Sequence, residues 1–195
     1  MIIEQIKKNK LYLSTGEIID ISPLIRMRYN LKIGDNINEY YNEIIYDAAV
    51  EKGIFLLSLR DRTKKEIILK LKEKYKNIQM IQKAVEKLEE LGYIDDFNYA
   101  LTYIKNKKYG KQRINFELYQ KGISKEIIEN AYNYLDEEEN NGQKSVEIKK
   151  LEIAIKKCIN KDEKKLIQYL LRQGFEFSKI IEKLKEYKEY GEFCE

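Results

Sequence analysis

The chain has 195 residues, of which 43% are apolar and 36% charged, with a formal net charge of only +4 and a single proline. This composition can supply the cores of one or two helical domains, and the charge balance does not by itself indicate a nucleic acid partner. Histidine is absent and the two cysteines are isolated, which argues against a zinc site, a disulfide framework and histidine-based catalysis.

The amino-terminal part, residues 1–45, differs in pattern from the rest of the chain. Residues 10–21 form two short apolar runs on either side of a glycine, which predicts a β-hairpin. Ser22 followed by Pro23 is the order expected of a helix N-cap and the first helical position, so a short helix is predicted to about Tyr29.

The next part of the chain predicts a group of helices. Residues 38–62 carry apolar side chains three and four positions apart, which indicates one long helix or two helices joined near Gly53. Thr63 and Glu66 have the spacing of a capping box, in which each side chain bonds to the other residue's backbone amide, so a second helix begins there. A third helix is predicted over residues 78–91.

A repeat emerges when three predicted N-caps are aligned. Gly110 follows Thr63 by 47 residues and Asp162 follows Gly110 by 52 residues, which is typical of helical repeat proteins. Large aliphatic residues stand four and eight positions after each cap: Ile67 and Leu71, Ile114 and Leu118, and Leu166 and Leu170. The alternative interpretation is that any amphipathic helices can be aligned by their leucines.

These patterns predict a mainly all-α chain of three tandem three-helix modules behind the small hairpin and helix. Because each module would contact mainly its neighbours, we expect an elongated molecule. The predicted parts are the hairpin and short helix at 1–45, the modules at 46–95, 96–135 and 147–187, an acidic connecting loop at 136–146, and a frayed end at 188–195.

The most specific motif lies between residues 91 and 128. A glycine and a tyrosine precede two aspartates and a tyrosine-containing helix, and a second helix then carries glycine, arginine and leucine before a closing Lys-Gly-Ile. Its residues are Gly92, Tyr93, Asp95, Asp96, Tyr99, Ala100, Gly110, Arg113, Leu118, Lys121, Gly122 and Ile123. This motif resembles that of the RecX family of recombination regulators. Since glycine past the end of a helix favours its termination, most of the motif is expected to be structural.

The resemblance implies a regulator, mainly a negative one, of the RecA recombinase. Members of the family are expected to bind the groove of the RecA filament on DNA and to limit ATP turnover, strand exchange or filament extension. The modular architecture predicts a monomer. The resemblance implies that its partner is the filament, with single- or double-stranded DNA contacted directly or through it. A DNA-binding helical module that acts without the recombinase is the alternative.

Basic residues are concentrated in two segments. Residues 60–76 contain eight basic and three acidic side chains, and residues 105–125 contain seven basic side chains and one acidic, Glu117. Their equivalent positions in the repeat favour contact with a polyanionic surface, although a solvated face explains any single lysine equally well. Arg113 directly precedes the predicted core residue Ile114, so we expect its side chain to point outward. The candidate contact residues are Arg60, Arg62, Lys64, Lys65, Lys111, Arg113, Lys121 and Arg172.

No arrangement of catalytic or cofactor-binding residues is evident in the sequence. The adjacent carboxylates Asp95 and Asp96 are explained by their place at the start of a helix. A phosphate-binding glycine loop, paired cysteines and a serine elbow are all missing from the sequence. We therefore expect no enzymatic activity and no cofactor. Without an apolar run long enough for a signal peptide or a membrane span, a cytoplasmic protein is expected.

Overall fold

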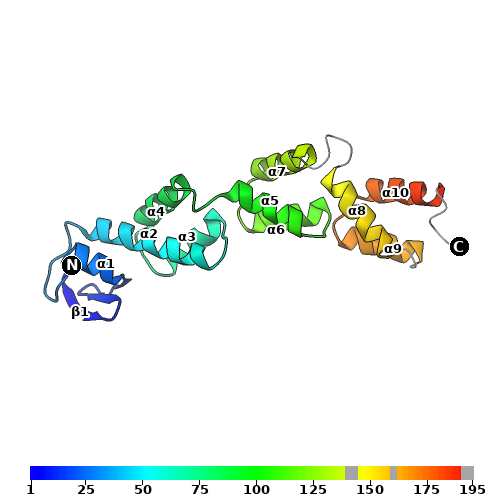
Figure 1. The fold of residues 1–195 in the computed structure, drawn as a ribbon. Coiled ribbons are helices and arrows are strands. Elements are labelled where there is room, and N and C mark those ends of the chain that lie inside the picture. The colour runs from blue at the N-terminus through cyan, green and yellow to red at the C-terminus, as the bar shows by residue number, and fades with distance from the viewer. Residues whose placement is uncertain (139–144, 159–161, 190–195) are drawn as a thin grey trace. The chain divides into compact units, whose positions relative to one another are not determined.

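A computed structural model describes residues 1–138, 145–158 and 162–189 of the chain (Figure 1). The described residues form a small antiparallel sheet and ten helices, which confirms the predicted mainly helical fold class. The chain divides into two compact units, Met1–Asp95 and Asp96–Glu195. No helix in the described ranges has both the length and the apolar character needed to cross a membrane.

The first unit begins with three strands, β1 (Ile3–Lys7), β2 (Lys10–Leu13) and β3 (Ile18–Asp20), paired antiparallel in that order. The predicted hairpin corresponds to β2 and β3. The sequence pattern missed β1 because its pairing with β2 shifts register between Ile3 and Gln5. Such a bulge interrupts the alternation of apolar and polar residues by which a strand is recognised.

Four helices complete the first unit: α1 (Pro23–Arg28), α2 (Tyr41–Leu59), α3 (Lys64–Lys72) and α4 (Ile78–Glu90). The helix α2 is continuous, so the first of the two predicted alternatives is confirmed. Gly53 lies buried inside it, and a β-carbon there would lie 2.3 Å from Cδ1 of Leu88 in α4. The glycine therefore permits close packing of α2 against α4, at the cost of helix propensity.

The capping box predicted at the start of α3 is present. The hydroxyl of Thr63 accepts a hydrogen bond from the amide of Glu66 at 3.2 Å, and the Thr63 amide donates to the Glu66 carboxylate at 3.4 Å. Thr63 is fully buried, so these bonds satisfy polar groups that water does not reach.

The described residues of the second unit form six helices: α5 (Asp96–Asn106), α6 (Lys111–Gln120), α7 (Lys125–Glu138), α8 (Val146–Lys156), α9 (Glu163–Arg172) and α10 (Phe177–Glu189). Two hydrophobic clusters hold it together, one built mainly by α5–α7 and the other by α8–α10. A further cluster joins the sheet and helices of the first unit.

The aligned positions of the repeat have equivalent places in the structure. Thr63, Gly110 and Asp162 are the N-caps of α3, α6 and α9. The six aliphatic residues that follow them are fully buried: Ile67, Leu71, Ile114, Leu118, Leu166 and Leu170. These observations support the division into three modules, which stays a prediction, as does the elongated shape.

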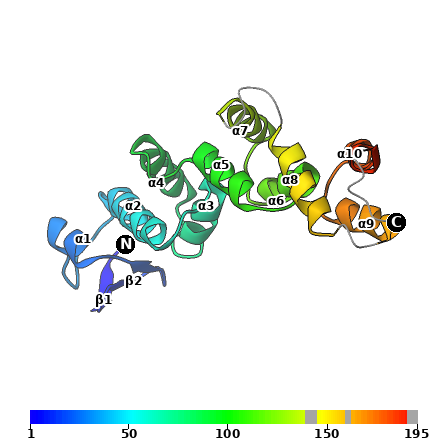
Figure 2. The same cartoon turned by 45° about the vertical axis from the view of Figure 1, so that its right-hand side comes forward.

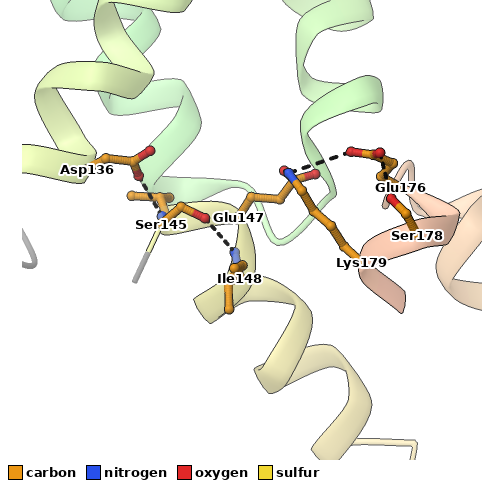
Figure 3. Close-up of polar contacts among 8 residues, drawn as sticks. Asp136, Ser145, Glu147, Ile148, Glu176, Ser178 and Lys179 are labelled. Carbon is orange, nitrogen blue, oxygen red and sulfur yellow. Dashed lines mark hydrogen bonds and ion pairs between the residues drawn. The ribbon is translucent and has the colours of Figure 1, made fainter. Parts of the chain in front are cut away.

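The predicted acidic loop at 136–146 is shorter than expected. Asp136, Glu137 and Glu138 still belong to α7, and Val146 already belongs to α8. The carboxylate of Asp136 accepts from the amide of Val146 at 2.7 Å, which gives this acidic residue a structural partner (Figure 3). The rest of the loop, 139–144, lies outside the described residues. At the other end, α10 includes the first two residues of the segment predicted to be frayed, and 190–195 are not described.

Candidate interaction site

The helix α6 begins without the side-chain cap that most helices use. Its N-cap is Gly110, and the first free amides of the helix bond to the end of α9 instead. The Gly110 amide donates to the carbonyl of Gln173 at 2.9 Å, and the Gln112 amide donates to the carbonyl of Gly174 at 3.1 Å. The carboxyl end of α9 thus caps the amino end of α6. These are the second helices of the third and second modules, and the opposite partial charges at the two helix ends attract each other.

Arg113 is held by two neighbours on the surface of α6. Its guanidinium carbon lies 3.6 Å from the centre of the Tyr109 ring, and its Nε donates to the Glu117 carboxylate at 3.1 Å. The side chain is 37% exposed, so it reaches solvent but is less free than its place before Ile114 suggested. The pair Arg113 and Glu117 could have been found in the sequence from its four-residue helical spacing.

Glu117 also links α6 to α5. The Tyr103 hydroxyl donates to its carboxylate at 2.6 Å. Partial burial opposes ionisation, yet the hydrogen bonds from Tyr103 and Arg113 prevail and lower the pKa of the Glu117 carboxyl. Burial, together with the bond to Glu117, raises the pKa of the Tyr103 phenol. Glu117 therefore stays ionised and fixes both partners.

Further basic side chains lie over the same tyrosines. Lys107 Nζ is 5.0 Å from the centre of the Tyr103 ring, and Lys121 Nζ is 5.6 Å from that of Tyr99 and 6.0 Å from that of Tyr103. The rings of Tyr99 and Tyr103 stack with centres 6.2 Å apart. We define the basic–aromatic cluster as Tyr99, Tyr103, Lys107, Tyr109, Arg113, Glu117 and Lys121.

Two of the three predicted contact residues of the second module therefore lie in one cluster. Arg113 and Lys121 are joined through Glu117 and Tyr103. Lys111 lies elsewhere, with Nζ 4.6 Å from the centre of the buried Tyr132 ring of α7. Lys107 was not among the predicted contact residues. It lies in the turn between α5 and α6, and the path of this turn places its ammonium group over the Tyr103 ring.

Three of the four predicted contact residues of the first module have ion-pair or hydrogen-bond partners within the first unit. Arg60 lies 3.6 Å from the Glu66 carboxylate, and Lys64 pairs with Glu89 at 2.7 Å. Arg62 donates from Nε to the carbonyl of Leu56 at 3.2 Å, whereas Lys65 is exposed on α3. These contacts offset part of the positive charge counted in the sequence.

The remaining predicted residues have mainly structural surroundings. Gly92 and Gly122 end helices with φ of 74° and 86°, and Leu118 is buried. Tyr93 is half exposed. In the third module Arg172 is exposed at the end of α9, where its Nε bonds to the carbonyl of Gln168 at 3.4 Å. Asp95 is exposed next to Asp96, the first residue of α5.

Comparison with known proteins identifies the family. The model described as "RecX, second three-helix domain" matches residues 95–131. The chain is 33% identical over 174 residues to the Regulatory protein RecX of Clostridium acetobutylicum, covering 81% of this chain and 79% of the relative. The chain belongs to the RecX family. The RecX protein of Caldanaerobacter subterraneus is 34% identical, over 72% of this chain and 71% of the relative.

A solved RecX structure has the same fold. The crystal structure of RecX from Lactobacillus salivarius superimposes with a TM-score of 0.60 at 24% identity, covering 74% of this chain and 97% of that one. RecX proteins form a family of regulatory proteins, not of enzymes. The part of the present chain that the structure describes contains no cluster of side chains able to hold a metal ion.

Proposed function

We propose that this protein binds the RecA recombinase filament on DNA and limits its ATP turnover, strand exchange or filament extension. Membership of the RecX family supports the proposal. The observation that carries it is the grouping of cationic and tyrosine side chains on and around α6, where the family model also matches.

The lysines on and around α6, both inside and outside the basic–aromatic cluster, are suited to a negatively charged partner. Lys107 and Lys111 rest over tyrosine rings, and within the described part of the chain neither forms an ion pair. A ring orders the ammonium group but leaves its N–H groups able to donate to a carboxylate or phosphate. The partner therefore meets ammonium groups whose positions are already restricted, which lowers the entropy lost on binding.

The second module is the stronger candidate for the contact, since its Lys107 and Lys111 form no ion pair within the described residues. The first-module residues Arg60 and Lys64, in contrast, pair with carboxylates. Exposed ion pairs are weak, so a partner could displace them at a small cost. Lys121 and Arg113 complete the proposed surface in the second module. Arg172 would extend it along the second helix of the third module.

The deciding experiment measures RecA-dependent ATP hydrolysis and strand exchange on single-stranded DNA with increasing amounts of this protein. We expect both activities to fall in a saturable way. Unchanged turnover and strand exchange at saturating protein, together with tight binding to naked DNA, would replace the proposal with a DNA-binding module that acts without the recombinase.

A further inference from the structure

An open groove of about 1060 Å³ lies in the first unit, and none of the predicted contact residues lines it. One wall is formed by β1, β2 and the turn between them, which contribute Lys7, Lys8 and Lys10. The other is α2, which contributes Lys52 and Phe55. Figure 2 shows the sheet and α2 facing each other in this unit.

The groove carries positive charge that its own side chains do not offset. Four lysines line it, against two carboxylates, those of Asp20 and Glu51, so its formal charge is +2. Asp20 is itself paired with Lys74 at 3.3 Å. Among the residues that the structure describes, none of the four lysines forms an ion pair, whereas Lys64 and Lys70 on α3 each pair with a glutamate.

Aromatic rings accompany the lysines along the groove. Phe55 is 52% exposed, although its ring is large and apolar, and Lys52 Nζ lies 4.8 Å from the ring centre. Tyr12 lies on the opposite wall, with Lys7 Nζ 5.9 Å from its ring centre. An exposed ring beside ammonium groups is the combination that single-stranded nucleic acids require, because bases stack on the ring while phosphates meet the cations.

A buried tyrosine ties the sheet to α2 beside the groove. Tyr75 is only 3% exposed, and its hydroxyl lies within hydrogen-bonding distance of two backbone carbonyls, that of Asp20 in β3 at 3.0 Å and that of Ala48 in α2 at 3.1 Å. This residue also lines the groove. The groove is therefore formed before any ligand arrives, and little free energy is needed to open it.

We propose that this groove binds a single strand of nucleic acid, with Lys8, Lys10 and Lys52 contacting phosphates and Phe55 stacking on a base. The inference deepens the proposed function by adding a site for the nucleic acid strand itself. It rests on the proposed function only where the bound strand is part of the recombinase filament. A duplex would hide the faces of its bases from Phe55. An acidic peptide would satisfy the lysines and leave the ring without a partner.

The test uses the full chain, a short fluorescein-labelled oligothymidylate and fluorescence anisotropy at several salt concentrations, without recombinase. The double variant Lys8→Glu and Lys10→Glu should weaken binding at least tenfold and reduce the slope of log affinity against log salt by about 1.4, for two lost phosphate contacts. Phe55→Ala should weaken binding about tenfold and leave that slope unchanged, because stacking releases no counterions.

A matched control separates the groove from general charge. Lys32 and Lys83 are exposed lysines of the same unit outside the groove, so Lys32→Glu with Lys83→Glu makes the same change in net charge. This control should lose less than threefold in affinity. Equal losses in the control and in the groove variant would overturn the proposal. So would equal affinity for a duplex of the same sequence, unaffected by Phe55→Ala.

An oligoglutamate peptide of similar charge identifies the other class of ligand. Its binding in place of oligothymidylate, with the same dependence on Lys8 and Lys10, would overturn the proposal. The recombinase assay is then run on the same variants. Strand binding through the groove without inhibition of ATP hydrolysis would refute the proposed function alone. If the protein inhibits ATP hydrolysis but its strand binding does not change with substitution of Lys8, Lys10 or Phe55, the proposed groove site alone is refuted.

Discussion

The backbones of Gly110 and Gly174 are in direct contact. A β-carbon on Gly110 would lie 2.3 Å from the carbonyl carbon of Gly174, and one on Gly174 would lie 2.5 Å from Cβ of Arg113. This contact allows the carbonyls at the end of α9 to cap the first amides of α6. It explains why the second module has glycine where the first has the capping residue Thr63.

Alanine at either glycine should therefore loosen the contact between α6 and α9. Gly174→Ala carries two costs, since φ at this residue is +84° and its β-carbon would meet the backbone of Arg113. We expect a loss of about 2 kcal/mol or more in the free energy of unfolding. Hydrogen exchange should show the Gln112 amide, which bonds to Gly174, exchanging faster than in the wild type.

Gly34 provides the control for this prediction. Its φ is +95°, and nothing lies within 4 Å of the position of a β-carbon. Gly34→Ala should thus cost only the backbone strain, about 1 to 2 kcal/mol, and leave exchange at Gln112 unchanged. If Gly110→Ala, which adds no backbone strain, left the Gln112 amide fully protected, the proposed capping of α6 by α9 would be wrong.

Two tyrosines of the second unit, the buried Tyr132 and the partly buried Tyr103, should respond differently to loss of their hydroxyl groups. The Tyr132 hydroxyl has no hydrogen-bond partner within the described chain, whereas that of Tyr103 donates to Glu117 at 2.6 Å. Tyr132→Phe should raise the urea midpoint or leave it unchanged, and Tyr103→Phe should cost about 1.5 to 3 kcal/mol, because its bond is to a charged group. A large loss with Tyr132→Phe would show that its hydroxyl has a partner.

The lowered pKa of Glu117 makes part of the second unit's stability depend on pH. A carboxyl whose pKa is lower in the folded than in the unfolded state stabilises the fold above the unfolded pKa, and this contribution is lost as pH falls through the folded one. In Tyr103→Phe the pKa of Glu117 should rise, because a hydrogen bond to the carboxylate is lost. Carbon-detected NMR titration of the Glu117 carboxyl measures the change, and an identical pKa in both proteins would contradict it.

One partly buried ion pair in the third module should contribute far more to the free energy of unfolding than an exposed pair of the same module. Glu147 of α8 is 5% exposed and accepts from Lys179 of α10, which also lies 3.7 Å from Glu176 (Figure 3). Lys179→Met would leave the Glu147 carboxylate buried and unpaired, at a cost of about 3 kcal/mol in unfolding free energy. Lys188 and Glu163, both more than 40% exposed, form a control pair at 2.8 Å. Lys188→Met should cost less than about 1 kcal/mol, and equal losses would contradict the argument.

Local patterns were predictable from the sequence, and long-range groupings were not. The cap of Thr63 and the burial of Ile114 and Leu118 depend on residues within one helix, so spacing alone predicts them. The strand β1 escaped detection because of its bulge. Lys8 and Lys52 lie far apart in the sequence, and only the fold places them along one groove.

The motif glycine Gly110 illustrates the same limit. Its spacing predicted an N-cap, which is confirmed, but the partner that makes glycine necessary stands more than sixty residues later in the chain, at Gly174. The outward direction expected for Arg113 was only partly right, because the stacking on Tyr109 depends on the path of the turn between α5 and α6. Contacts of this kind depend on how distant segments pack together, so they produce no periodic pattern in the sequence.

The last prediction concerns the surface proposed to meet the recombinase filament. A substitution that reverses the charge of Arg113 would also break its contacts with Tyr109 and Glu117, so a change in activity could reflect a damaged fold. Lys107 and Lys111 are better targets, because neither forms an ion pair among the described residues and the ammonium group of each lies over a tyrosine ring. Lys107→Glu with Lys111→Glu should leave helical content unchanged and shift the melting temperature only slightly. Inhibition of RecA-dependent ATP hydrolysis should then require at least tenfold more protein, because two attractive charges become repulsive.

The control for this surface is a pair of exposed lysines on other helices. Lys164 lies on α9 and Lys185 on α10, so Lys164→Glu with Lys185→Glu produces the same net charge on the same unit. This variant should inhibit at nearly the wild-type concentration. Salt adds a second readout, since an attraction between charged groups at the protein surface weakens as ionic strength rises. The wild type should therefore lose inhibition with increasing salt more steeply than the Lys107 and Lys111 variant. Full inhibition by that folded variant would show that these lysines are only a solvated surface.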